Sequence, residues 1–150
     1  HLQSYLKQLP DFDDMEAEER AMIHALHHPS VHQSLSFLIS WPSLDQAADL
    51  VLSRADELDG NHYEVLTPAA DALEANYPLA SMLLRRALID FALAKGRSSR
   101  YRHAARHLKE CENLAGLIED FGPYETHESY EKRLQAEHGR KSGFWSLVAA

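Results

Sequence analysis

The sequence predicts an all-α protein of stacked antiparallel helical hairpins, with no sheet. Apolar residues recur at steps of three and four along several stretches, and no segment alternates with period two over a useful length. Helix starts near Asp11, Leu44 and Pro78 are 33 and 34 residues apart, close to the ~34-residue period of tetratricopeptide hairpins. A further unit would begin near Glu112, inside a helix. We therefore expect a tetratricopeptide-like, α-solenoid-like stack and not a regular repeat array.

The length and amino-acid composition of the chain fit one helical domain over residues 1–150. The chain is 45% apolar and contains few Gly and Pro residues, so it can bury a substantial core. Because it begins with His1 and not Met, we expect it to be a fragment or processed product of a longer protein. Its one cysteine, Cys111, excludes an intramolecular disulfide and favours a reducing compartment. No apolar run is long enough to span a bilayer, so we expect a cytoplasmic protein without a membrane partner.

The first half of the chain carries start and stop signals for a series of short helices. The expected helices cover residues 1–9 (the tail of a helix), 14–28, 31–40, 44–58 and 68–76. Ser30 is placed to cap the helix over 31–40, and Ser43 with Gln46 forms a capping-box pattern for the next one. Pro68 is suited to the first turn of the last of these helices, with a possible helical turn over 61–67 before it.

Residues 77–118 predict two long helices joined as a hairpin. The first covers 78–95, with Pro78 in its opening turn and Gly96 as a left-handed stop. The second covers 99–118. The connection between them is so short that the helices must lie antiparallel. Because the first is apolar around most of its circumference, we expect neighbours on more than one side of it.

Polar residues inside this hairpin are expected to be structural. Arg86 and Asp90 lie four residues apart, which predicts a partly buried ion pair beside the leucines of the first helix. Cys111 lies on the apolar stripe of the second helix. A reactive cysteine needs an exposed, electropositive setting, so we expect an inert core thiol.

The C-terminal part predicts one more helix and a closing element. Gly122 and Pro123 indicate a loop, after which Thr126 can cap a helix over 127–138 that stops at Gly139. A basic turn over 140–143 follows. Residues 144–150 then supply Phe144 and Trp145, which we expect to dock as the cap over the last apolar face of the stack.

Two segments resemble a poorly characterised bacterial family. They are YPLASMLLRRALIDFALAKGRSSRYRHAARHL and HGRKSGFW, which together extend over residues 77–145. Members of that family include proteins of unknown function and the helical tails of some SWIM zinc-finger proteins. The resemblance implies an all-α, tetratricopeptide-like C-terminal region and no catalytic residue. With Cys111 alone, this chain cannot contain the SWIM finger, so the binding role inferred for that finger is not transferred.

The histidines do not form a metal motif in the sequence. His24, His27, His28 and His32 are close together, but Pro29 separates the last of them from the others. His103 and His107 have the i, i+4 spacing of ligands on one helix face. However, the glutamate of the zinc-protease pattern is absent, and the flanking arginines would repel a dication. We therefore predict no metal and no cofactor.

The basic face around residues 95–109 is the best candidate for binding. The chain carries a net charge of −8, but residues 1–75 hold 3 Lys/Arg against 14 Asp/Glu, while residues 76–150 hold 12 against 9. The candidate binding residues are Arg97, Arg100, Arg102, Arg106, Lys109, Arg140 and Lys141. The simpler alternatives are a solvated helix face, or a face neutralised by the acidic first half.

We predict a non-catalytic protein-interaction module, because stacked hairpins expose an extended surface and no catalytic constellation stands out. A phosphate-binding loop, a nucleophile elbow and a Ser/His/Asp signature are all absent from the sequence, so we do not predict an enzyme. The alternative is a nucleic-acid-binding module that uses the 95–109 face on phosphates. Few aromatic residues are interleaved there for base stacking, which favours a protein partner of unidentified kind.

Overall fold

The computed structural model describes residues 30–41 and 43–150, and within these ranges it contains helices and no strand. The α-helices are α3 (Val31–Ser40), α4 (Leu44–Ser53), α5 (Tyr63–Leu73), α6 (Pro78–Ala94), α7 (Tyr101–Ala115), α8 (His127–His138) and α9 (Ser142–Ala149). Two 3₁₀ turns, η1 (Ala55–Glu57) and η2 (Ser98–Arg100), precede α5 and α7. The prediction of an all-α protein is confirmed. The tetratricopeptide-like, α-solenoid-like stacking of the hairpins stays a prediction.

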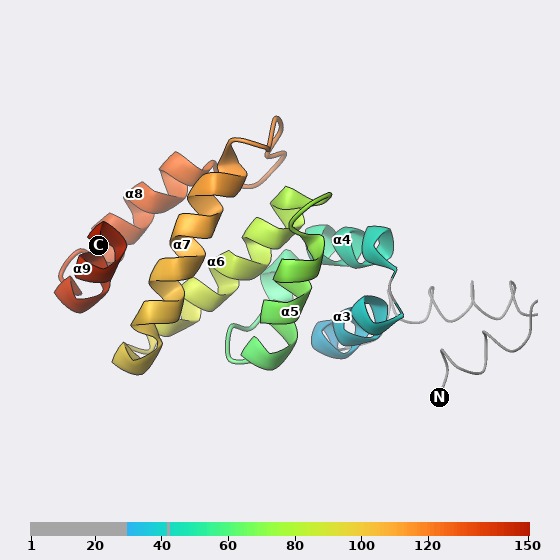
Figure 1. Cartoon of the computed structure of the whole chain (residues 1–150), viewed down its shortest axis with the longest axis horizontal. Coiled ribbons are helices and arrows are strands. Elements are labelled where there is room, and N and C mark those ends of the chain that lie inside the picture. Colours follow the sequence, from blue (N-terminus) through green and yellow to red (C-terminus); the bar gives the residue numbers. More distant parts are fainter. Residues whose placement is uncertain (1–29, 42) are drawn as a thin grey trace, which may run out of the picture.

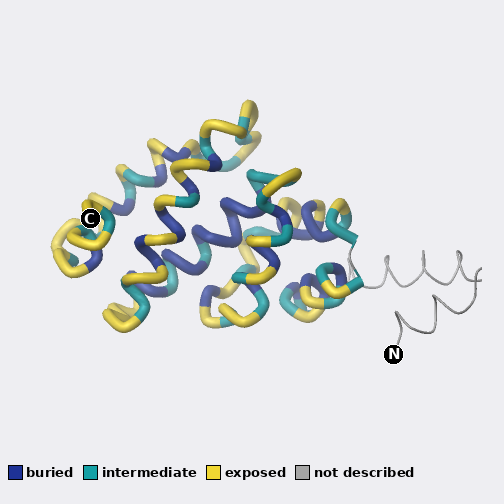
Figure 2. Tube along the Cα trace, viewed as in Figure 1, coloured by how far each residue is buried: buried dark blue, intermediate teal, exposed yellow. Residues whose placement is uncertain are grey.

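Helix α6 lies in the middle of the molecule. It packs against α4, α5 and α7, and Figure 1 shows α3 and α4 beyond one of its sides and α8 and α9 beyond the other. Pro78 occupies its first turn, and Gly96 follows it with a φ of 60°, a conformation that glycine adopts without strain. Figure 2 shows most of its trace as buried. The expectation that this helix has neighbours on more than one side is confirmed.

Two hydrophobic cores meet at α6. The first core combines α3, α4, α5 and residues of α6 such as Leu84. The second combines α7, α8, α9 and other residues of α6, such as Ile89. Because one helix supplies side chains to both cores, the two halves of the described chain are packed into one continuous unit.

The predicted N-caps are confirmed at two of three positions. The Ser30 side chain accepts a hydrogen bond from the backbone N–H of Gln33, and the Thr126 side chain accepts one from that of Ser129. The capping box at Ser43 is wrong. Its side chain makes no cap hydrogen bond and instead donates to the Asp45 carboxylate, 3.4 Å away.

Helix α5 begins earlier than predicted, at Tyr63, and contains Pro68 in its interior. Pro68 cannot donate the usual hydrogen bond to the residue four before it, so this helix has one hydrogen bond fewer than a regular helix. The buried residues Leu66, Ala69, Ala70 and Leu73 extend across the proline. Burying this apolar face outweighs the loss of one backbone hydrogen bond.

Helix α4 ends five residues earlier than predicted, at Ser53, and η1 follows it. Gly60 then brings the chain close against α6. A Cβ atom at this position would lie 2.2 Å from the Ala87 carbonyl oxygen. Only glycine lets the backbone approach α6 so closely. The start of α5 is therefore held against α6.

The closing element is confirmed and begins at Ser142. Phe144 is fully buried and forms edge-to-face ring contacts with Tyr101 and Trp145. The Trp145 indole N–H donates to the His138 carbonyl, 2.9 Å away. The aromatic pair thus covers the second core, as expected.

The helices expected over 1–9 and 14–28 lie outside the described residues. Among the residues that are described, no helix is both long and apolar enough to cross a membrane.

Candidate functional site

A groove of about 520 Å³ lies between α5 and the start of α7. Leu88 of α6 contributes an apolar side chain to it. Tyr63, Glu64, Thr67 and Pro68 line the α5 side, and Ser99, Arg100, His103, Arg106 and His107 line the α7 side. The volume falls within the ~300–1,000 Å³ typical of ligand sites. The groove therefore combines an apolar base with a rim that is mostly basic on one side.

Arg100 joins the two sides at one end of the groove. Its guanidinium lies 4.8 Å from the centre of the exposed Tyr63 ring and 5.1 Å from the Phe91 ring. Cation–π contacts of this kind hold an arginine in place without neutralising it. The Arg100 charge is consequently positioned and still free to attract an anion.

A buried arginine, Arg85, connects the helices that flank the groove. Only 1% of the residue is exposed, yet its guanidinium forms ion pairs with three carboxylates. Asp71 of α5 lies at 3.1 Å, Glu74 at the end of α5 at 3.6 Å, and Glu110 of α7 at 3.0 Å. One side chain of α6 thereby holds both α5 and α7.

His107 lines the groove and is fixed by the same arginine. Its Nδ1 lies 3.0 Å from an Arg85 nitrogen, which can only donate, so Nδ1 accepts and the proton of the neutral ring is on Nε2. Burial, and then the charge of Arg85, lower the pKa of His107 to about 4. His107 is therefore a neutral N–H donor in this setting.

The structure places only two of the seven predicted binding residues in this groove, Arg100 and Arg106. Arg106 is exposed and forms an ion pair with Glu110 at 3.5 Å. Arg97 packs over the Phe91 ring at 5.5 Å and does not line the groove.

The other four predicted residues lie elsewhere. Arg102 and Lys109 are on the exposed face of α7, where the Lys109 ammonium donates to the Ala150 carbonyl at 2.7 Å. Arg140 and Lys141 lie in the turn between α8 and α9 and line a separate hollow. The predicted basic stripe is thus divided among three surfaces.

The predicted ion pair between Arg86 and Asp90 is wrong. Arg86 instead donates to the Glu125 carbonyl at 2.9 Å, and its guanidinium lies 4.7 Å from the centre of the Tyr130 ring. The Tyr130 hydroxyl donates to the Asp90 carboxylate at 2.7 Å. Tyr130 of α8 therefore contacts both Arg86 and Asp90, and these contacts replace a direct ion pair between them.

Burial shifts the pKa values of this second group. Desolvation lowers the pKa of Arg86 and raises that of Asp90, because burial disfavours the charged form of each. Burial also raises the pKa of Tyr130, and the negative charge of Asp90 raises it further. These residues form a structural polar cluster inside the second core.

The other histidines of the first cluster and Cys111 were also considered in the sequence analysis. The His32 ring stacks on His62 with 4.0 Å between centroids, and its Nε2 accepts from the Asp59 backbone N–H. His24, His27 and His28 lie outside the described residues. The expected core position of Cys111 is confirmed, since its thiol is buried, and this burial raises the pKa of Cys111 to about 12.

Sequence reasoning missed Arg85 as the residue that holds the flanking helices. The signal was present, because an arginine in so apolar a helix must find partners. Its partners come from two different helices, α5 and α7, and the sequence alone does not show that these meet at Arg85.

Comparison with known proteins identifies one family. The model of a family of unknown function (DUF6880) matches residues 1–147. No curated protein matches the chain, and no solved structure does.

Proposed function

The chain belongs to the family of unknown function DUF6880, and we propose that it is a non-catalytic protein-interaction module. Its site is the groove between α5 and α7, and its ligand is an acidic segment of a partner protein. The observation that carries the proposal is the composition of this groove, in which an apolar base lies beside Arg100, His103 and Arg106.

The charges favour an acidic ligand. Arg100 and Arg106 line the groove together with a single carboxylate, that of Glu64. Arg106 keeps part of its charge available, because Glu110 is also paired with Arg85. The Nε2–H of His107 adds a neutral donor, so carboxylate oxygens can be both attracted and hydrogen-bonded.

The rim residues also favour a protein partner. Tyr63 is exposed and in contact with Arg100. Tyrosine and arginine are the residue types most enriched at the energetic centres of protein interfaces. We propose no catalytic role for His107, because Arg85 occupies its Nδ1 and its low pKa makes it a weak base at neutral pH.

Nucleic-acid binding is the second candidate, because Arg102, Arg106 and Lys109 share the exposed face of α7. Binding of this kind would depend on all exposed cations of the face and would weaken steeply with salt. The overall charge of −8 opposes it.

The wider setting is part of the same proposal. The module is one domain, residues 1–150, of a cytoplasmic bacterial protein, and its helices form a tetratricopeptide-like stack. The order of the helices along the long axis in Figure 1 supports this arrangement, since stacked hairpins present grooves between successive helices.

The test is peptide selection followed by two matched double variants. A random peptide library displayed on phage is selected on the unmodified chain, and the enriched peptides are measured by titration calorimetry. The first variant combines Arg100→Gln with Arg106→Gln. The second, the control, combines Arg102→Gln with Lys109→Gln, which removes the same charge from residues that do not line the groove.

We expect acidic peptides whose affinity falls at least about tenfold in the first variant and changes little in the second. Peptides without Asp or Glu, or equal losses in both variants, would contradict the proposal. Duplex and single-stranded DNA and RNA are titrated in parallel. Tight, salt-sensitive binding that is weakened by both variants would favour the nucleic-acid alternative.

A further inference from the structure

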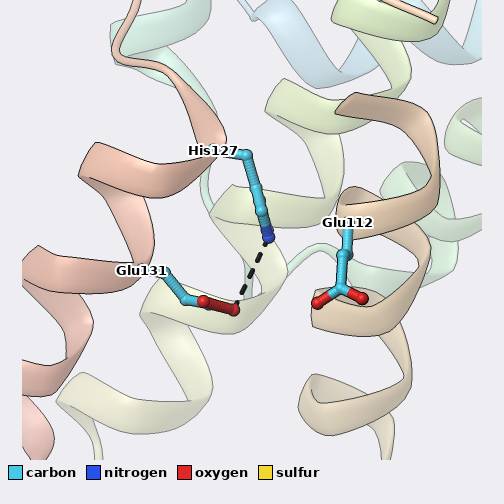
Figure 3. Close-up of side chains that lie close together, drawn as sticks. All are labelled: Glu112, His127 and Glu131. Atoms are coloured by element: carbon cyan, nitrogen blue, oxygen red, sulfur yellow. Dashed lines mark ion pairs between the residues drawn. The ribbon is translucent and has the colours of Figure 1, made fainter. Parts of the chain in front are cut away.

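Three side chains with metal-binding atoms meet between α7 and α8. Glu112 comes from α7, and His127 and Glu131 come from the first turns of α8. One ligand atom from each lies within 4.8 Å of the others. Figure 3 shows the His127 ring and the Glu131 carboxylate directed toward one another, with the Glu112 carboxylate beside them on the neighbouring helix.

His127 is the residue that points to a ligand. Only 9% of it is exposed, and neither ring nitrogen has a hydrogen-bond partner. Its Nε2 lies 3.6 Å from the Glu131 carboxylate, which is too far for a hydrogen bond. A buried imidazole without partners is costly, so a group that binds Nε2 would relieve a real energetic penalty.

The spacing of the donors suits a tetrahedral cation. With bonds of ~2.0–2.2 Å, two ligands of a tetrahedral zinc ion lie ~3.3–3.6 Å apart. His127 Nε2 and the Glu131 oxygen are already at 3.6 Å. Glu112 is exposed, so its flexible side chain can close the remaining distance.

The charges also require compensation. Two carboxylates converge on one imidazole. Within the part of the chain that the structure describes, Glu131 pairs with His127 alone, and Glu112 forms no ion pair. A divalent cation would neutralise both carboxylates.

We propose that Glu112, His127 and Glu131 bind a divalent transition-metal ion of the zinc type, with water at the fourth position. One nitrogen and two oxygen donors suit zinc and similar ions, whereas Ca²⁺ and Mg²⁺ prefer oxygen ligands only. The ion would connect α8 to α7 beyond the loop over 116–126. This site is separate from the groove between α5 and α7.

The experiment uses the chain without an affinity tag, freed of metal by chelation. Co²⁺ is added as a spectroscopic probe and then displaced by Zn²⁺. We expect one Co²⁺ per chain, a visible spectrum of tetrahedral type, and a rise in Tm of roughly 3–6 °C with saturating Zn²⁺. Ca²⁺ and Mg²⁺ should produce neither effect.

Two variants and two controls locate the ion. His127→Ala and Glu112→Gln should each weaken Co²⁺ binding at least about tenfold. His103→Ala and Glu128→Gln should leave it unchanged, because these exposed residues lie on the same two helices but outside the cluster. The controls matter because the chain has ten histidines.

Co²⁺ binding that persists in His127→Ala or Glu112→Gln would overturn the proposal, as would the absence of stoichiometric binding to the unmodified chain. Glu112 is exposed, so Glu112→Gln preserves the fold and decides the question even if His127→Ala does not fold. If the proposal is overturned, His127 and Glu131 form only an ion pair within α8.

Discussion

Two consecutive arginines of α6, Arg85 and Arg86, are both buried, but they are accommodated in opposite ways. Arg85 faces α5 and α7, where Asp71, Glu74 and Glu110 surround it. Arg86 faces α8 and the loop before it, where its guanidinium donates to a backbone carbonyl and lies over the face of the Tyr130 ring.

The difference shows how a buried charge can be stabilised at low cost. The side chains of Asp71, Glu74 and Glu110 remain 64%, 45% and 27% exposed, so they pair with Arg85 while keeping water around them. Only the arginine is fully desolvated. Arg86 lacks this compensation, and desolvation lowers its pKa. We infer that Arg85 holds the fold together and that Arg86 is tolerated.

The largest expected effect comes from replacing each arginine by methionine, which has a similar length and no charge. Arg85→Met should lower the free energy of unfolding by about 2–4 kcal/mol, because it leaves the buried Nδ1 of His107 without a donor and removes the ion pairs with three partly exposed carboxylates. Arg86→Met should change it by less than about 1 kcal/mol, since removing a poorly compensated buried charge offsets the lost contacts. Urea unfolding at neutral pH measures both.

Similar losses in the two variants would mean that the carboxylates around Arg85 contribute little. A larger loss for Arg86→Met would reverse the comparison.

The next effect depends on pH and concerns His107. Its pKa is about 4 in the folded chain, against an ordinary value of 6.5. Above pH 6.5 the ring is neutral in both states and its contribution is fully present. As the pH falls from 6.5 toward 4, the unfolded state takes up a proton that the folded state refuses, so stability is lost. Over this window the loss is about 3 kcal/mol at most.

His107→Asn isolates this contribution, because an asparagine oxygen can still accept from Arg85 but does not titrate. The free energy of unfolding of both proteins is measured at several pH values by urea titration. We expect the difference between them to shift in favour of His107→Asn as the pH falls below 6.5. A difference independent of pH would show that His107 is readily protonated in the folded state.

A smaller effect is expected on the Arg86 side from Tyr130→Phe. This change removes the hydrogen bond to the partly buried Asp90 carboxylate and keeps the ring under Arg86. Hydrogen bonds to charged groups contribute ~1.5–3 kcal/mol, so we expect a loss of about 2 kcal/mol in thermal unfolding. No loss would indicate that Asp90 is already protonated in the native chain, in the direction of its raised pKa.

The smallest effect is expected for an exposed ion pair, which serves as the reference for the contacts of both arginines. Lys132 and Glu128 form an exposed i, i+4 pair at 3.2 Å on α8, away from either arginine. Lys132→Ala should change the free energy of unfolding by no more than about 0.5 kcal/mol. A change as large as that of Arg85→Met would undermine the distinction between hydrated and buried pairs.

The sequence predicted most of the helices, because their signals are local. Pro78 and Gly96 fixed the ends of α6, and Ser30 and Thr126 fixed two helix starts. The prediction failed where packing overrode such a signal. Pro68 is a common first residue of a helix, but the buried residues on both sides of it extend α5 back to Tyr63.

The candidate sites were less predictable, because their residues come from different helices. Arg100 and Arg106 were predicted as binding residues, but nothing local indicates that they face Tyr63 across a groove. In the same way, His127 and Glu131 have a recognisable i, i+4 spacing, whereas Glu112 joins them only through the packing of α7 against α8.

The distance between α5 and α7 tests the role of Arg85 most directly. Glu64→Cys and Arg102→Cys introduce one cysteine at an exposed position on each of these helices. Spin labels are attached to the two cysteines, and the distribution of the distance between the labels is measured by pulsed electron paramagnetic resonance. The buried Cys111, whose pKa is raised to about 12, should not react with the label. We expect a narrow distribution in the otherwise unmodified chain and in Arg86→Met, and a broad one in Arg85→Met. Distributions that are identical in all three proteins, or equally broad in both arginine variants, would contradict the account.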